Sequence, residues 1–240
     1  MSTNSVAFLV LFVRVPKDGA GSDVVGSRVA KRWTDSETKD KGTASISTCS
    51  LFSYMSSKLT PNSPFQPTCL QGRVALLTGG GSGIGFEIAR QLPHHGCRAV
   101  VLCGRRANFL QKACTILQAE SPASVVAYQV CDVRKPESCQ MAVQYCREQF
   151  GALDILVNGA AGNFLAKAAD LKPKGFATVL EIDTMGTFNM SYAAYPLLKQ
   201  SRVGAVVINI SATLQCPGKS CSCLCAPWVI SEIFSDNMMI

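Results

Sequence analysis

From residue 72 onward the sequence alternates between short apolar runs and longer stretches with helical spacing. The apolar runs, which predict strands, are residues 73–78, 99–103, 124–130, 153–158 and 204–210. The stretches that predict helices are residues 82–95, 107–120, 135–150 and 175–200. Strands that alternate with helices form a parallel sheet covered by helices on both faces. Right-handed crossovers then predict a doubly wound α/β fold of the Rossmann type with strand order 3-2-1-4-5.

The segments on either side lack this alternation. Residues 1–70 are rich in serine and threonine and show neither the apolar spacing of a helix nor that of a strand. This predicts an irregular N-terminal extension. Residues 71–214 form the predicted α/β domain, whose C-terminal strands are incomplete for this type of fold. Residues 215–240 are an atypical cysteine-rich tail that continues neither pattern.

The composition argues against several classes of protein. A net charge of +7 is spread along the 240 residues without a basic run interleaved with aromatics, so we predict no nucleic-acid partner. The apolar run at 5–13 is too short to span a bilayer, and no other run is longer. Of the 12 cysteines, five are expected in core elements as small apolar side chains, namely Cys97, Cys103, Cys114, Cys131 and Cys146. The cysteines at 216–225 have no histidine near them, so we predict no metal site.

A glycine-rich turn, Thr-Gly-Gly-Gly-Ser-Gly-Ile-Gly from Thr78 to Gly85, joins the first predicted strand to the first helix. Glycine allows a tight turn and a close approach of the backbone to a pyrophosphate, while N–H groups at the helix start face the phosphates. Such a turn alone also suits an ordinary strand–helix connection, but its place within repeated strand–helix units favours a dinucleotide site. The predicted cofactor-binding residues here are Gly79, Gly81, Ser82, Gly83, Ile84 and Gly85.

The second strand ends in Gly104-Arg105-Arg106, at the place where an acidic residue usually binds the ribose hydroxyls of NAD. A carboxylate there would repel the 2′-phosphate of NADP, whereas a guanidinium binds it through paired hydrogen bonds. No Asp or Glu occurs between Arg98 and Glu120. We therefore predict that Arg105 and Arg106 bind this phosphate and that the cofactor is NADP(H). Two solvated surface arginines are the alternative.

Further cofactor contacts are predicted after the third and fourth strands. Asp132 is placed to accept a hydrogen bond from the adenine amino group, although capping of the helix that starts near Lys135 is an equally good interpretation. The small residues from Asn158 to Gly162 let the backbone lie against the cofactor. We expect Asn158 and Ala160 to contribute there.

Together these motifs resemble the short-chain dehydrogenase/reductase family, and most of all its peroxisomal 2,4-dienoyl-CoA reductases. The residues that carry the resemblance lie within 72–214, namely 78–86, 158–165, 182–189 and 207–214. The resemblance implies an oxidoreductase that uses NADPH to reduce a 2,4-dienoyl-CoA to a 3-enoyl-CoA, in the degradation of unsaturated fatty acids. It also implies an acyl-CoA thioester as substrate, a homo-oligomer and a peroxisomal location.

The resemblance assigns site residues as well. Asp183 matches an acidic residue that orients or protonates the dienolate, for which a buried carboxyl with a raised pKa is suited. A structural hydrogen bond at a helix turn is the alternative role. Arg134 and Phe164 match positions that line the acyl-CoA, while Lys172 and Lys174 either meet coenzyme A phosphates or are solvated.

The sequence departs from the family after Thr213. The usual Y-x-x-x-K helix has no match there, and Tyr195 to Lys199, which spells that motif, precedes the fifth strand and is interpreted as coincidence. The register places Ala212, not Ser211, at the usual serine position. We expect the fifth strand to be left as an unpaired apolar edge.

The leading expectation is therefore the NADPH-dependent reductase itself, in a truncated form that could be inactive. The alternatives are a catalytically dead protein that binds NADP or a partner, and a short-chain reductase acting on 3-oxoacyl or steroid substrates. The last residues, Met238-Met239-Ile240, do not match the S-K-L type of peroxisomal signal, so location rests on the resemblance and is cytoplasmic otherwise.

Overall fold

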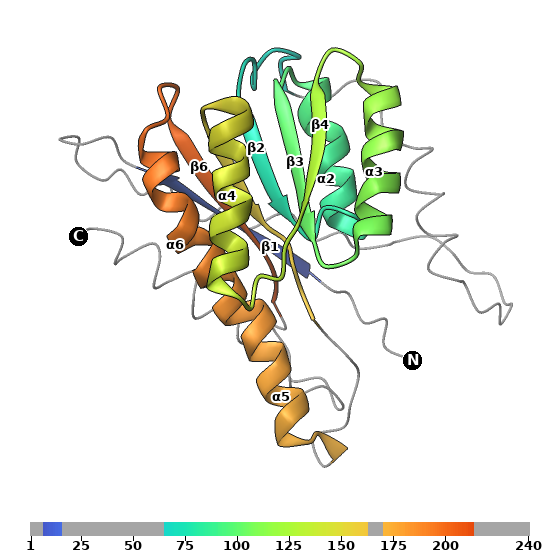
Figure 1. Ribbon diagram of the computed structural model, residues 1–240, viewed down its shortest axis with the longest axis vertical. Helices are drawn as coiled ribbons and strands as arrows, with labels where there is room; N and C mark the ends of the chain where they lie inside the picture. Colours follow the sequence, from blue (N-terminus) through green and yellow to red (C-terminus); the bar gives the residue numbers. More distant parts are fainter. Residues whose placement is uncertain (1–6, 16–64, 163–169, 214–240) are drawn as a thin grey trace, which may run out of the picture.

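The computed structural model describes residues 7–15, 65–162 and 170–213, which form one sheet with helices packed on both faces (Figure 1). The strands are β1 (Ala7–Val15), β2 (Val74–Thr78), β3 (Ala99–Gly104), β4 (Val125–Val130), β5 (Ile155–Asn158) and β6 (Ala205–Thr213). Their order in the sheet is β1-β6-β5-β2-β3-β4. Strands β2 to β6 are parallel, so the predicted Rossmann-type order 3-2-1-4-5 is confirmed.

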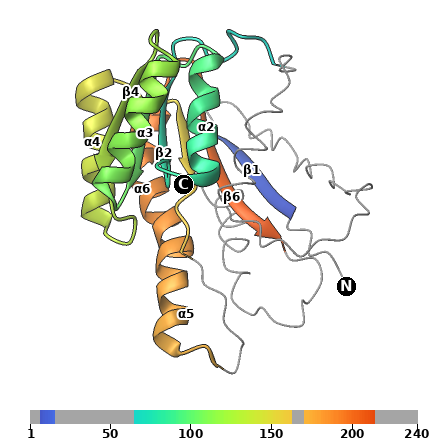
Figure 2. The same ribbon diagram turned by 90° about the vertical axis from the view of Figure 1, so that its right-hand side faces the viewer.

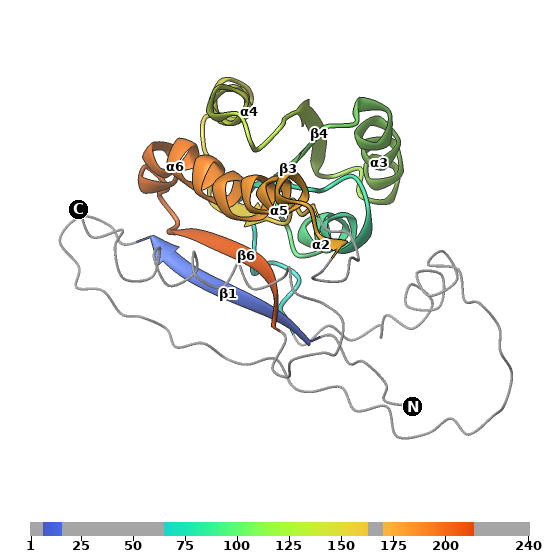
Figure 3. The ribbon, with the colours of Figure 1, turned by 90° about the horizontal axis from the view of Figure 1, so that it is seen from below.

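The helices are α2 (Gly83–His94), α3 (Ala107–Glu120), α4 (Pro136–Phe150), α5 (Pro173–Leu180), η2 (Glu181–Met185) and α6 (Gly186–Lys199). Helices α2 and α3 cover one face of the parallel sheet, and α4 and α6 cover the other (Figure 3). Helix α5 extends beyond the sheet (Figure 2). No helix among the described residues is both long and apolar enough to cross a bilayer.

Burial explains why the central strands are apolar without interruption. Every residue of β2 and β5 is buried, because helices cover both faces of the sheet at its centre. Two hydrophobic clusters result, one on each face, and they share the sheet as a wall. Strand β4 lies at the edge and is only half-buried.

Strand β1 is a departure from the sequence prediction. Residues 7–15 fall within the extension expected to be irregular, but they pair antiparallel with β6, from Ala7 opposite Thr213 to Val15 opposite Ala205. The expectation that the fifth parallel strand ends in an unpaired edge is therefore wrong, since its outer edge is occupied by β1. The apolar run at 5–13 is the sequence signal for this strand.

The helix predicted over residues 175–200 is continuous but not uniform. It contains the π segment η2 between α5 and α6, where the backbone N–H of Gly186 donates to the carbonyl of Glu181. A π turn holds one residue more than an α turn; such turns are rare and frequently occur at functional sites. The apolar spacing alone does not distinguish it from an α-helix.

At the amino ends of the strands, Asp154 ties three elements together. Its buried carboxylate accepts hydrogen bonds from the backbone N–H of Val74 at 2.9 Å and from the hydroxyl of Ser201, just after α6. Its own N–H donates to the Val74 carbonyl, and its carbonyl accepts from Val206. Asp154 thus fixes the start of β2 and the end of α6 through its carboxylate, and the start of β6 through its backbone carbonyl.

The Asp154 network predicts a stability effect. Asp154→Ala leaves a buried N–H and a buried hydroxyl without an acceptor, which is expected to lower the free energy of unfolding by about 2 kcal/mol. Asp154→Asn should cost less, because its carbonyl can serve Val74 and the Ser201 hydroxyl can reverse to accept. Urea unfolding measures the free energy of unfolding of both variants. An equal decrease in the two would contradict the proposed role of the unpaired donors.

Candidate functional site

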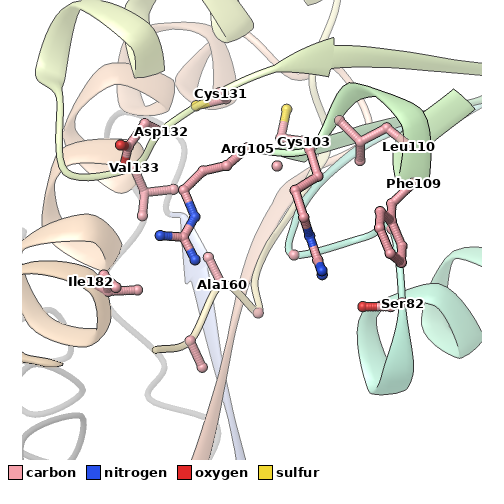
Figure 4. A pocket seen from close by; sticks show the side chains of 16 residues that line it. Ser82, Cys103, Arg105, Phe109, Leu110, Cys131, Asp132, Val133, Ala160 and Ile182 are labelled. Atoms are coloured by element: carbon pink, nitrogen blue, oxygen red, sulfur yellow. The ribbon is translucent and has the colours of Figure 1, made fainter. Parts of the chain in front are cut away.

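A pocket of about 230 Å³ opens at the carboxyl ends of the central strands (Figure 4). It is bounded by the glycine turn after β2, the end of β3 and the start of α3, the residues after β4, and the turn after β5. Of the predicted cofactor residues, those that line it are Gly79, Gly81, Ser82, Arg105, Arg106, Asp132 and Ala160. Those that do not line it are Gly83, Ile84, Gly85 and Asn158.

The glycines of the turn are required by contact and by conformation. Gly79 has a φ of 71°, and a Cβ there would lie 2.5 Å from the carbonyl oxygen of Gly159. A Cβ on Gly85 would collide with the backbone carbonyl of Gly79. Gly83, with a φ of 63°, has open space where a Cβ would be. The turn is therefore packed tightly on its inner side and left open at the start of α2, which suits a diphosphate.

Thr78 joins the two turns that bound the pocket. Its hydroxyl oxygen accepts hydrogen bonds from the N–H groups of Gly159 and Ala160, both at 3.1 Å, and donates to the Val157 carbonyl. Thr78 is the first residue of the glycine motif, but the motif does not indicate this role. The available signal is a hydroxyl at the end of an otherwise apolar buried strand.

The start of α2 is suited to an anion. Ser82 is the N-cap residue, but its side chain makes no capping hydrogen bond. The first N–H groups of a helix lack partners inside the helix and carry its positive dipole end. With the hydroxyl of Ser82 lining the pocket beside them, these donors are placed to hold a phosphate.

Arg105 and Arg106 enter the pocket from the end of β3. Within the described part of the chain neither forms an ion pair. The guanidinium of Arg106 lies over the ring of Phe109, 4.0 Å from its centroid. The pocket thus contains positive charge that no described carboxylate neutralises by direct contact.

Asp132 lines the pocket but is already engaged. Its carboxylate binds the guanidinium of Arg134, with an Nη2–Oδ2 distance of 2.6 Å, and accepts from the Arg134 backbone N–H. The hydrogen bond from the Arg134 side chain holds the pKa of Asp132 below its usual value. Helix α4 has Lys135 as N-cap residue and no side-chain cap, so the capping interpretation of Asp132 is wrong.

Asn158 faces away from the pocket. Its buried side-chain amide donates to Ser191 Oγ at 3.0 Å and to Asn209 Oδ1 at 2.8 Å, which connects β5 to α6 and β6. The structure therefore gives this side chain a role between layers, and only the turn that follows it reaches the pocket.

Asp183 lies on the π segment η2 and is buried. One carboxylate oxygen accepts the backbone N–H of Gly162 at 2.8 Å. Burial raises the pKa of Asp183, and the hydrogen bond from Gly162 partly offsets that rise. Its neighbour Ile182 lines the pocket, whereas Asp183 does not. The structural hydrogen bond considered from the sequence is present, and a catalytic role remains a prediction.

The predicted substrate residues are not gathered at the pocket. Arg134 is paired with Asp132, and Lys172 and Lys174 are exposed at the start of α5. Phe164 lies outside the described residues. Tyr195 packs against the core near the end of α6, and Lys199 is the last residue of that helix, in agreement with the interpretation of their motif as coincidence.

The pocket is also lined by Cys103 and Cys131, which the sequence pattern predicts only as core residues (Figure 4). Both are buried, and neither forms a disulfide with another described residue. Among the described residues no three His, Cys, Asp or Glu side chains are grouped to hold a metal ion. The cysteines at 216–225 lie outside the described residues.

The family is established by comparison with known proteins. The family model described as short chain dehydrogenase matches residues 73–226, which is more than half of the chain. The chain belongs to this family, and the resemblance drawn from the motifs is confirmed.

Two relatives illustrate the match. The peroxisomal 2,4-dienoyl-CoA reductase of Arabidopsis thaliana is 49% identical over 160 residues, which cover 64% of this chain and 53% of the relative. The enzyme of the same name from Rattus norvegicus is 42% identical over 155 residues, with coverages of 65% and 52%. The chain spans about half the length of the curated relatives it matches.

Solved structures agree with the fold. A citronellol catabolism dehydrogenase from Pseudomonas aeruginosa PAO1 is 32% identical with a TM-score of 0.52, covering 56% of this chain and 54% of that one. An NADPH-bound short chain oxidoreductase from the same organism, described as containing an atypical catalytic center, is 26% identical with a TM-score of 0.53, covering 57% and 52%.

The contacts of Gly79 predict that even a methyl group there weakens binding of a nicotinamide cofactor. Gly79→Ala forces a side chain into a left-handed conformation and against the Gly159 carbonyl, so affinity for such a cofactor is expected to fall at least about tenfold. Gly151→Ala is a matched control, because Gly151 has a φ of 68° but nothing within 4 Å of its Cβ position. Calorimetric titration with NADPH compares them, and equal affinities for both variants would contradict the requirement for this contact.

Burial of Asp183 predicts a dependence on pH. Because the pKa is raised from 3.8, the folded chain keeps a proton that the unfolded chain releases. The wild type should therefore lose stability relative to Asp183→Asn as the pH rises from 3.8 to the folded-state pKa. The side-chain oxygen of asparagine can still accept the hydrogen bond from the Gly162 N–H. Urea unfolding at several pH values measures the difference, and a difference that does not change with pH would contradict the raised pKa.

Proposed function

We propose that the chain binds NADP(H) and reduces 2,4-dienoyl-CoA thioesters to 3-enoyl-CoA products. The observation that carries the proposal is the pair of arginines in the pocket, at the end of β3, with no ion-pair partner among the described residues. The 2′-phosphate is the group that distinguishes NADP from NAD, and two guanidinium groups favour it. The names of the curated relatives support the substrate class.

The pocket residues fit such a cofactor. The open space at Gly83, the backbone N–H groups at the start of α2 and the Ser82 hydroxyl suit the diphosphate. Arg105 and Arg106 would hold the 2′-phosphate, and Asp132 would lie beside the adenine. Gly159 and Ala160, which Thr78 fixes, would form the opposite wall. When bound, NADPH supplies the hydride for the reduction.

Asp183 is the residue we propose for proton transfer. Burial raises its pKa, which favours the protonated carboxyl that a general acid needs. The hydrogen bond from Gly162 fixes one carboxylate oxygen beside the turn after β5. Arg134, Phe164, Lys172 and Lys174 remain proposed contacts of the acyl-CoA, and Arg134 would have to leave Asp132 to take part.

Location and assembly are inferred from the relatives. We infer a peroxisomal location, because the curated relatives are named as peroxisomal enzymes. We also infer a homo-oligomer, which is a property that the resemblance implies.

A second candidate is a protein that binds NADP(H) without turnover. Two observations favour it: Asp183 already accepts a backbone hydrogen bond, and its side chain does not line the pocket. The two candidates share the cofactor site and differ only in chemistry, so one assay separates them.

The test is NADPH oxidation by the full chain with 2,4-hexadienoyl-CoA, and with a 3-oxoacyl-CoA and a steroid ketone as competing substrates. We expect turnover of the dienoyl-CoA, with NADH a poorer cofactor. Asp183→Asn should lower the rate by about 10²-fold or more and leave NADPH affinity unchanged.

The control for this assay is Gly83→Trp, which fills the open space at the start of α2. Saturable NADPH binding with no turnover above that control would establish the second candidate instead. Absence of NADPH binding by the wild type would remove both.

A further inference from the structure

Phe109 is an aromatic residue whose place in the fold is not explained by packing. It lies in the first turn of α3 with 43% of its surface exposed and lines the pocket, where Figure 4 shows it next to Ser82. Its neighbour Leu110 is buried in the core and fulfils the packing role at this end of the helix. The contact that Phe109 does make is with the guanidinium of Arg106, 4.0 Å from the ring centroid.

The backbone around this contact is fixed. Arg106 is the N-cap residue of α3, and its carbonyl accepts from the N–H groups of both Phe109 and Leu110 at 3.2 Å. A Cβ built on Gly81 would lie 3.2 Å from the Leu110 side chain, so the start of α3 packs directly against the glycine turn. The ring and the guanidinium are therefore held beside the turn that we propose for the diphosphate.

The Arg106 guanidinium lies over the Phe109 ring, which leaves it N–H donors that can point away from the ring. Stacking uses the face of the planar group, whereas its N–H donors lie in the plane and point outward. An arginine on the surface without such a support occupies many rotamers, and binding a phosphate has to restrict them. A ring beneath the guanidinium restricts them beforehand.

We propose that Phe109 is a positioning residue that holds Arg106 ready to bind the 2′-phosphate of NADP(H), and so contributes to the choice of NADP over NAD. The inference rests on the proposed function.

The test compares affinities of the full chain for NADPH, NADH and 2′,5′-ADP by calorimetric titration. Phe109→Leu removes the ring but stays apolar and helix-compatible, and it is expected to weaken NADPH and 2′,5′-ADP about two- to fivefold while NADH affinity is unchanged. Phe109→Tyr keeps the ring and should retain the wild-type affinities for NADPH and 2′,5′-ADP. Ile116→Ala is the matched control, since Ile116 is 47% exposed on the same helix and does not line the pocket.

A double-mutant cycle identifies the route of the effect. In an Arg106→Ala background, Phe109→Leu should cause no further loss of NADPH affinity if the ring acts only through that guanidinium. An additional loss equal to that in the wild-type background would overturn the inference.

The outcomes separate this inference from the proposed function. Equal affinity of Phe109→Leu and the wild type for NADPH, or equal weakening for NADPH and NADH, would overturn the positioning role and leave a wild-type preference for NADPH intact. A wild type that binds NADPH no better than NADH would overturn both.

Discussion

The pocket depends on the contact between two turns at the carboxyl edge of the sheet. The Thr78 hydroxyl holds the N–H groups of Gly159 and Ala160, and Gly79 touches the Gly159 carbonyl so closely that no side chain fits between them. This contact sets how far apart β2 and β5 end. The arginines after β3 and the π segment before α6 are then positioned relative to a fixed wall.

Much of this arrangement could be predicted from the sequence, because the physical constraints on it are local or repetitive. Strands buried on both faces must be apolar throughout, so the runs at β2, β3 and β5 are evident without coordinates. A glycine turn between strand and helix has few alternatives, and the positions of Gly79 and Gly81 in the pocket follow from it. The phosphate-binding role predicted for the arginines after β3 rests on the absence of a carboxylate at that position.

What could not be predicted depends on side-chain direction and on pairing between distant segments. From the sequence, Asp132 could face an adenine, a helix end or an arginine. In the structure its carboxylate forms an ion pair with Arg134. Asn158 follows the same strand as the pocket turn but faces α6. An α turn and a π turn have similar apolar spacing, so η2 was indistinguishable from its flanks. The pairing of β1 with β6 joins residues at opposite ends of the described chain.

That pairing has a consequence for how the protein is made. A chain grows from its N-terminus, so β1 leaves the ribosome before the other described strands and its partner β6 follows about 200 residues later, which takes roughly 10 to 40 s at ordinary rates of synthesis. Strands β2 to β5 pair with one another, so these pairs can form within that interval. The nine-residue strand Ala7–Val15, apolar except for Arg14, has to stay unpaired for the same period. Pairing of β1 with β6 therefore comes after the other described strands have been made, and an apolar strand prone to association has to be shielded until then.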